Sequence, residues 1–99
     1  MMTTDIFIAY EFPDPWASRM IEVGQDFERL VQRLADRKVL VTPYGPVIYR
    51  CRPGLDPQQH GVPLAAYCGE GVVNPVTEHG KTSGLMMSAS DFVLEFLDE

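Results

Sequence analysis

Cysteine, histidine and tryptophan are scarce in this chain, whose 99 residues include two cysteines, two histidines and one tryptophan. A small secreted domain usually carries several disulfides, because its core alone is too small to stabilise it. We therefore expect Cys51 and Cys68 to be reduced, half-buried thiols. A bridge between them is geometrically possible if their strands are neighbours.

Long hydrophobic runs are also absent. No apolar stretch approaches the roughly 20 residues that span a bilayer, and residues 1–5 lack the basic start and apolar stretch of a signal peptide. The hydrophobic content of 45% is nevertheless typical of a chain that folds around one core. We expect a single domain over residues 1–99 that is cytoplasmic and binds no membrane.

Basic residues are outnumbered, since 8 lysines and arginines face 14 acids and the net charge is −6. The acidic excess is strongest at the C-terminal end, where residues 87–99 hold four acids and no base. An acidic chain repels phosphate, which argues against direct binding of nucleic acid or of an anionic membrane. The same charge is compatible with a basic protein partner.

The spacing of apolar residues predicts a strand followed by a long helix. Alternation over residues 5–12 predicts the strand. Its buried face would carry Ile6, Ile8, Tyr10 and Phe12. Asp14 and Pro15 suit the N-cap and the first helical position. Apolar residues then recur at three- and four-residue steps, which predicts an amphipathic helix over about 15–37.

Further strands are expected in the middle of the chain. Two β-rich runs joined by a turn of proline and glycine predict a hairpin, with Tyr44 near its tip. The predicted strands are 39–42, 47–52, 62–68 and a short fifth around 72–76.

The chain ends in a second predicted helix. Ser88 and Asp91 have the spacing of a capping box, which predicts a short C-terminal helix over about 89–97. The order of elements predicts an α+β fold in two layers. Its mostly antiparallel sheet of four to five strands would carry the long helix on one face, with the short helix beside it.

Residues that could bind a metal are few and widely separated. The candidates are Cys51, His60, Cys68 and His79, which are spaced nine, eight and eleven residues apart. Zinc sites usually contain close ligand pairs, because one turn presents two ligands together. We expect no metal site.

Catalytic patterns are equally weak. Cys68 could be combined with His79 and Glu78, but no nucleophile-elbow motif accompanies them. Gly80-Lys81-Thr82 is similar to the end of a phosphate-binding loop, but Pro75 stands where that loop requires its first glycine. We therefore expect no enzymatic activity and no cofactor.

An open sheet face is the one candidate for RNA binding, because aromatic rings beside arginines can stack bases. That face would carry Ile48, Arg50, Arg52, Phe7, Leu40 and Tyr67. The net charge of −6 argues against this function, since RNA-binding modules usually have a basic surface.

A protein-binding surface is the leading hypothesis, because a base-free run of acids selects basic partners. We expect the binding residues to be Asp91, Glu95, Asp98 and Glu99, then Glu22 and Asp26, which lie four apart on the predicted long helix. Tyr44 is a candidate aromatic anchor, and Trp16 is another.

In size, acidity and lack of catalytic motifs, the chain resembles small phage-encoded inhibitors of host defence, such as anti-CRISPR proteins, and bacterial immunity or antitoxin-like proteins. The resemblance implies a non-enzymatic inhibitor that blocks a basic partner, such as a nucleic-acid-binding protein, by direct contact. Two alternatives stay open. One is a homodimeric structural or accessory subunit, and either a monomer or a homodimer fits the sequence. The other is a small ligand-binding or enzymatic domain that uses the loop over residues 69–84.

Overall fold

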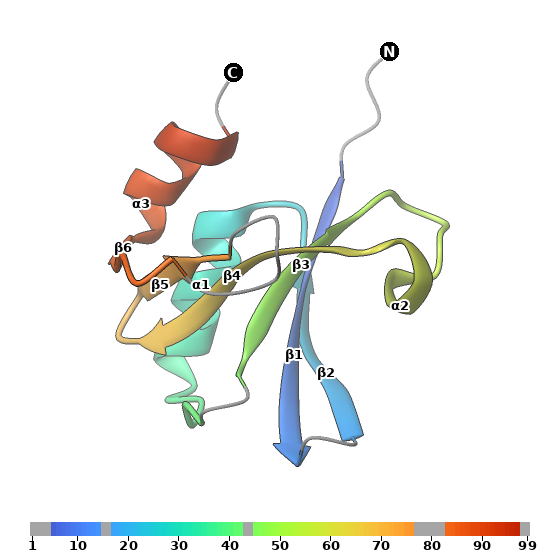
Figure 1. The fold of residues 1–99 in the computed structure, drawn as a ribbon, viewed down its shortest axis with the longest axis horizontal. Coiled ribbons are helices and arrows are strands. Elements are labelled where there is room, and N and C mark those ends of the chain that lie inside the picture. Colours follow the sequence, from blue (N-terminus) through green and yellow to red (C-terminus); the bar gives the residue numbers. More distant parts are fainter. Residues whose placement is uncertain (1–4, 15–16, 43–44, 77–82, 98–99) are drawn as a thin grey trace.

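The structure is a computed structural model, and it describes residues 5–14, 17–42, 45–76 and 83–97. Its six-stranded sheet has the order β2-β1-β3-β4-β5-β6, and every neighbouring pair is antiparallel. The strands are β1 (Ile6–Asp14), β2 (Ala17–Gly24), β3 (Val47–Cys51), β4 (Val62–Gly69), β5 (Val72–Pro75) and β6 (Met87–Ser88). The helices are α1 (Phe27–Asp36), α2 (Pro57–His60) and α3 (Ala89–Phe92), and α3 continues as a π-helical turn over Val93–Leu97. Figure 1 shows this arrangement.

The predicted α+β class is confirmed, but the predicted long helix is wrong. Residues 17–24 form strand β2, which pairs with β1, and the helix begins only at Phe27. Asp26, not Asp14, is the N-cap, because its carboxylate accepts a hydrogen bond from the backbone N–H of Arg29 at 3.1 Å. Gly24 and Gln25 interrupt the helical pattern just before this cap, where a glycine disfavours helix.

The predicted sheet of four to five strands is also wrong, because the described residues form a sheet of six strands. The predicted hairpin of 39–42 with 47–52 does not form. In its place Thr42 and Gly45 form an isolated β-bridge. Strand β3 has two edges, and β1 and β4 occupy them. The predicted strands 62–68 and 72–76 are confirmed as β4 and β5, and β6 is an addition.

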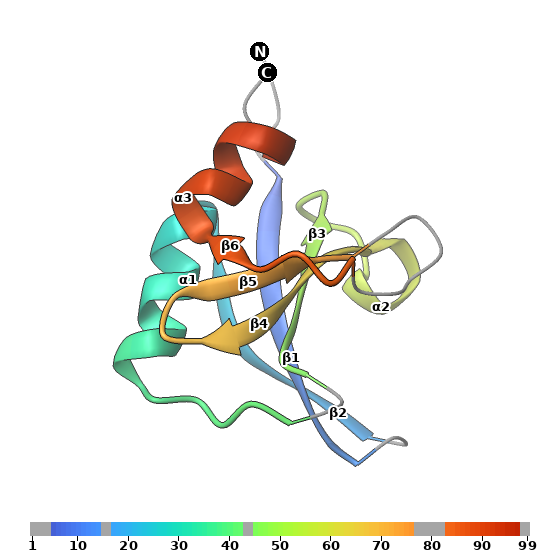
Figure 2. The same ribbon diagram turned by 60° about the vertical axis from the view of Figure 1, so that its left-hand side comes forward.

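The helices cover both faces of the sheet (Figure 2): α1 and α3 lie on one side, and α2 lies on the other. The main core lies between the sheet and α1 with α3. It consists of Ala9, Phe27, Leu30, Val31, Leu34, Ile48, Ala65, Tyr67, Val73, Ala89 and Phe92. A smaller cluster on the α2 side consists of Ile8, Tyr10 and Cys51, with Ile6, Phe12 and Tyr49 packed against them. Strand β1 is therefore buried on both faces, and the predicted buried face with Ile6, Ile8, Tyr10 and Phe12 is one of them.

Candidate protein-binding surface

The C-terminal helix is attached to the core by a ladder of phenylalanine rings. The ring of Phe92 stacks on that of Phe27 with centroids 4.7 Å apart, and the ring of Phe96 stacks on Phe92 at 5.0 Å. Phe92 is 1% exposed, whereas Phe96 is 53% exposed. At the start of α3 the Ser88 hydroxyl accepts a hydrogen bond from the backbone N–H of Asp91, as the capping box predicted. The helix is thus fixed to the domain along one side only.

Large apolar side chains are exposed along this same segment. They are Leu85, Met86, Leu94 and Phe96, each more than half exposed. Asp91 and Glu95 are exposed among them, and residues 83–97 contain no lysine or arginine. Large apolar side chains exposed in one short segment can mark an interaction site. We call residues 85–97 the C-terminal surface.

The first turn of α1 extends the acidic character of this surface. The Ser90 hydroxyl donates a hydrogen bond to the Glu28 carboxylate at 3.2 Å, across 62 positions of sequence. A cleft of about 260 Å³ lies beside this contact. Its lining consists of Phe7, Gln25, Asp26, Phe27, Glu28, Val93 and Leu97. Asp26 therefore lies close to the C-terminal helix. One partner could contact the start of α1 and the C-terminal helix together.

Glu22 does not take part in this surface. The sequence placed Glu22 one helical turn from Asp26, but Glu22 lies on strand β2. Its carboxylate forms ion pairs with Arg33 at 3.0 Å and with Arg37 at 2.6 Å, and its side chain is only 16% exposed. Those two guanidinium groups compensate its charge, which leaves less of that charge for a basic partner. Tyr44, Asp98, Glu99 and Trp16 lie outside the described residues.

The same two arginines cover part of the free edge of the sheet. Arg33 donates a hydrogen bond to the backbone carbonyl of Val23 at 3.1 Å, and Arg37 donates to that of Ile21 at 2.8 Å. Strand β2 is the terminal strand of the sheet, so these carbonyls would otherwise be available to another strand. Side chains of α1 thus occupy the edge over residues 21–23.

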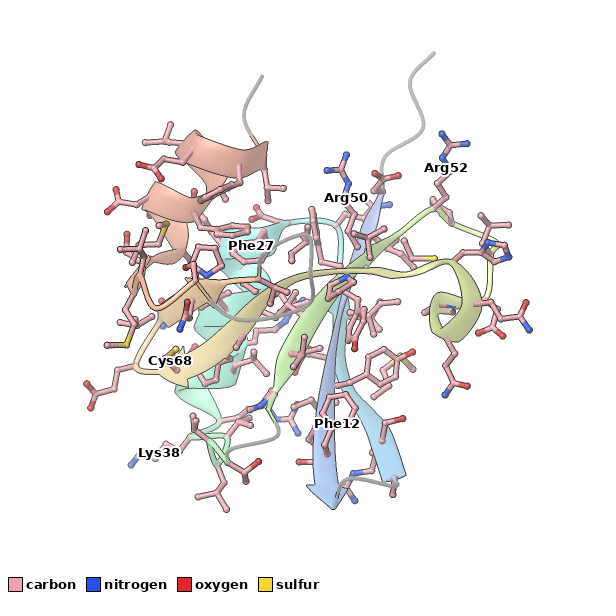
Figure 3. The ribbon with its side chains drawn as sticks, in the orientation of Figure 1. Phe12, Phe27, Lys38, Arg50, Arg52 and Cys68 are labelled. Carbon is pink, nitrogen blue, oxygen red and sulfur yellow. The ribbon has the colours of Figure 1, made fainter. Side chains whose placement is uncertain are left out.

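The two cysteines are free thiols. Their strands β3 and β4 are neighbours, but Val47 faces Ala66, so Cys68 lies beyond the opposite end of β3 from Cys51. Along the strand direction, Cys51 and Cys68 are separated by six residues, which is roughly 20 Å at ~3.3 Å per residue. A disulfide needs Cα atoms within about 7 Å, so this bridge cannot form without refolding. In Figure 3 Cys68 lies far from Arg50 and Arg52, the neighbours of Cys51.

The other chemical candidates gain little from the structure. Within the described parts of the chain, no three metal-binding side chains come together. Burial raises the pKa of the Cys68 thiol, which disfavours the thiolate that a nucleophile needs. Its suggested partners Glu78 and His79, and Lys81 of the glycine-lysine motif, lie outside the described residues.

The sheet face proposed for RNA is covered. Ile48 and Tyr67 are buried beneath α1 and α3, and the ring of Phe7 packs edge-on against Phe27 at 5.7 Å. Arg50 forms an ion pair with Asp5 at 2.6 Å. Bases could not stack on rings that already lie in the core.

Sequence reasoning missed an aromatic pocket on the α2 side of the sheet. The pocket measures about 160 Å³. It is lined by Tyr10, Phe12, Ser18, Tyr49, Pro57, Gln58 and Gly61. The rings of Tyr10 and Tyr49 meet at 89° with centroids 5.5 Å apart. Burial raises the pKa of both hydroxyls, so both are neutral at physiological pH. The signal in the sequence that could have indicated this pocket was the alternation of Tyr10 and Phe12 in β1. The sequence analysis placed both residues on a buried face.

Comparisons with protein-family models, curated proteins and solved structures gave no match to this chain. Among the described residues, the helices are all too short or too polar to cross a membrane.

Proposed function

We propose that this protein is a non-enzymatic inhibitor that binds a basic partner protein through its C-terminal surface. The observation that supports this proposal is the exposure of Leu94 and Phe96 beside the exposed acids Asp91 and Glu95, with no base in residues 83–97. Apolar contact would supply affinity, and the acids would select a partner with complementary charge.

The rigidity of the surface supports the proposal. Phe96 rests on Phe92, which in turn rests on Phe27 in the core, so the exposed ring is held in place before any partner arrives. A preorganised aromatic side chain loses little conformational entropy on binding, and aromatic residues are common energetic hot spots. Phe96 is accordingly our choice of central contact.

The acids set the chemistry of the partner. Asp91 and Glu95 are exposed on the C-terminal helix, and Asp26 and Glu28 at the start of α1 line a cleft with Val93 and Leu97 of that helix. The lysines and arginines with which a partner binds the phosphates of nucleic acid would contact these carboxylates instead. A protein seated there would compete with nucleic acid for the same basic surface.

A capture experiment with matched variants tests the proposal. Tagged protein is incubated with nuclease-treated bacterial lysate at about 0.1 M and about 0.5 M salt, because salt screens surface charge pairs. We expect the wild type to retain a basic protein at the lower salt, and the double variant Asp91→Lys/Glu95→Lys to lose it. The matched control Asp36→Lys/Glu70→Lys makes the same charge change at exposed positions elsewhere and should retain the partner.

Two further measurements separate binding from inhibition. Phe96→Ser should weaken capture without changing the circular dichroism spectrum, because the ring is half exposed. The recovered partner is then assayed for nucleic-acid binding with and without this protein, and we expect loss of the nucleic-acid complex. Retention of the partner by both charge-reversed proteins would remove the C-terminal acids from the mechanism.

Homodimerisation through the edge of β2 is less well supported than partner binding. Met20 and Val23 are exposed on that strand, which favours contact with a second copy. However, Arg33 and Arg37 already occupy the carbonyls of Val23 and Ile21. Light scattering at micromolar concentration distinguishes the two hypotheses, since strand addition across this edge predicts a dimer that Arg37→Ala would strengthen.

A further inference from the structure

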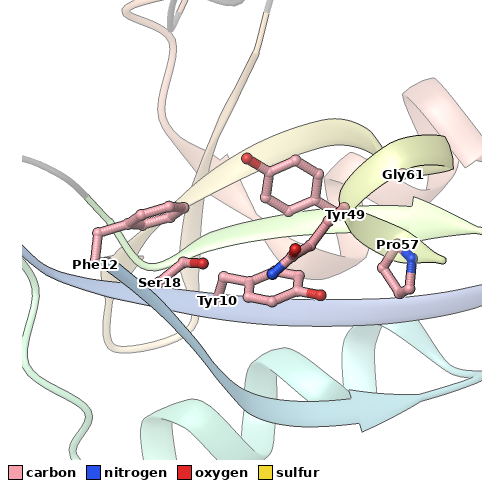
Figure 4. Close-up of a pocket in the computed structure, with 7 residues that line it drawn as sticks. Tyr10, Phe12, Ser18, Tyr49, Pro57 and Gly61 are labelled. Carbon is pink, nitrogen blue, oxygen red and sulfur yellow. The ribbon is translucent and has the colours of Figure 1, made fainter. Parts of the chain in front are cut away.

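The aromatic pocket has the walls of a cation-binding cage. In Figure 4 the rings of Phe12 and Tyr49 stand around that of Tyr10, and Pro57 closes the far end. The perpendicular rings of Tyr10 and Tyr49 form two adjoining walls. Aromatic faces carry negative electrostatic potential, so several rings around one small space attract a cation that water hydrates weakly.

Two glycines allow these walls to close. A Cβ atom on Gly61 would clash with the backbone oxygen of Pro57 and lie 3.5 Å from the ring of Tyr49. A Cβ atom on Gly45 would lie 2.9 Å from the ring of Phe12. The absence of both side chains lets α2 approach Tyr49 and lets Phe12 pack over the turn before β3. The pocket is therefore built by close backbone approach on both sides.

A carboxylate adds negative charge at the pocket. Asp56 is the N-cap of α2, and its carboxylate accepts a hydrogen bond at 3.0 Å from the backbone N–H of Gln58, a lining residue. Burial first, and then the charge of Asp56, raise the pKa of the Tyr10 hydroxyl. The lining residues given above include no charged side chain, and the charge of Asp56 acts on the hydroxyl of one of them, Tyr10.

The size of the pocket limits its occupant. Pockets for drug-sized ligands measure about 300–1,000 Å³, whereas this one measures about 160 Å³. A single head group fits such a volume, and a nucleotide or a flat cofactor does not. The Ser18 hydroxyl is the polar group from β2, and Figure 4 shows it directed toward Tyr10.

We propose that the pocket formed by Tyr10, Phe12 and Tyr49 beside Asp56 binds an alkylated ammonium head group. The positive charge would lie against the ring faces while its methyl groups fill the apolar space, and Asp56 would neutralise the charge. This site lies on the opposite side of the sheet from α3, so it does not depend on the function proposed for the C-terminal surface.

A pair of probes of equal shape tests the role of charge. Choline and its neutral isostere 3,3-dimethyl-1-butanol are titrated into the full chain, and binding is followed by the NMR signals of the tyrosine rings. We expect choline to bind about tenfold more tightly than the alcohol, because the alcohol keeps the methyl contacts and loses the attraction to the rings. Equal binding of the two probes, or no shift with either, would overturn the proposal.

Three variants identify the groups responsible. Tyr49→Phe keeps the ring and should keep choline binding, whereas Tyr49→Leu should lose it. Asp56→Asn removes the charge but preserves the helix cap, since asparagine caps as well as aspartate does, and it should weaken choline binding while leaving the alcohol unaffected. Circular dichroism confirms the fold of each variant. Equal choline affinity for Tyr49→Leu and wild type would contradict the cage.

The same titration distinguishes two sources of this chemistry. A short peptide containing trimethyllysine is compared with the same peptide containing unmodified lysine and with free choline. Tighter binding of the methylated peptide than of choline would identify a modified protein side chain as the ligand. Tighter binding of choline would identify a small metabolite or a lipid head group. Equal binding of methylated and unmethylated peptides would overturn the requirement for alkylation.

Discussion

Truncating Phe92 tests whether the C-terminal helix is part of the folded core. Phe92 is 1% exposed and its ring lies between those of Phe27 and Phe96. Removing a buried phenylalanine side chain costs about 3–5 kcal/mol, from lost burial plus the cavity left behind. A domain of this size is stable by about 5–15 kcal/mol. We therefore expect Phe92→Ala to fold but to be much less stable.

Phe96→Ala provides the matched comparison, because the same atoms are removed one turn later. Full burial of a phenylalanine side chain contributes ~1.5–3 kcal/mol. Phe96 is 53% exposed, so its truncation loses about half of that free energy. Its stacking on Phe92 adds about 0.5–1.5 kcal/mol. We expect a loss of about 1–3 kcal/mol, roughly 2 kcal/mol less than for Phe92→Ala.

Urea denaturation followed by circular dichroism measures this difference. Small proteins lose about 1–3 kcal/mol of stability per molar urea, so Phe92→Ala should lower the midpoint by about 2 M and Phe96→Ala by about 1 M. Equal midpoints for the two variants would refute this reasoning, because they would mean that Phe92 is no more deeply buried than Phe96. Wild-type capture of the partner by Phe92→Ala but not by Phe96→Ala would assign the outer ring to binding.

Four further outcomes are expected. Glu22→Gln should destabilise the fold by about 1 kcal/mol in thermal melts, because it weakens two ion pairs whose arginines are partly exposed. The control Glu28→Gln, at an exposed site, should change stability by less than about 0.5 kcal/mol. Gly61→Ala should cost about 1–3 kcal/mol by overpacking against the Pro57 carbonyl, and a melting temperature equal to wild type would count against the close approach of α2. The free energy of unfolding should fall as pH rises above about 10. Burial raises the pKa of Tyr10 and Tyr49 in the folded protein, so the unfolded chain loses those protons first. Tyr49→Phe should make this dependence of stability on pH less steep. Mild oxidation should leave the native monomer without a Cys51–Cys68 bridge in non-reducing mass spectrometry, whereas a loss of two hydrogens would contradict the strand register.

Several elements could be predicted because their signals are local. The strands β4 and β5 follow from runs of β-favouring residues between turns, and the C-terminal helix follows from the Ser88 cap. Helical spacing also identified the buried side of α1. Its buried residues are Phe27, Leu30, Val31 and Leu34. In each case the residues that carry the signal also form the structure.

The start of α1 could not be predicted, because residues 14–24 carry local signals of a helix. Asp14 and Pro15 suit a helix start, and apolar residues follow them at helical spacing. Pairing of residues 17–24 with β1 decides the matter, supported by Arg33 and Arg37 reaching back from α1 to the carbonyls of β2. These two hydrogen bonds join residues 10 and 16 positions apart, and such contacts produce no periodic pattern in the sequence.

The two candidate sites divide in the same way. The acids of the C-terminal helix and their lack of bases are visible in the sequence, because charge is a property of the residues themselves. The proximity of Asp26 to that helix and the aromatic pocket were decided only by the tertiary structure. The pocket joins β1, β2, β3 and α2, four segments whose side chains meet only when the sheet has paired. The sequence thus determined composition, charge and local periodicity, while strand pairing determined which of those residues share a surface, because register is a long-range property of the folded chain.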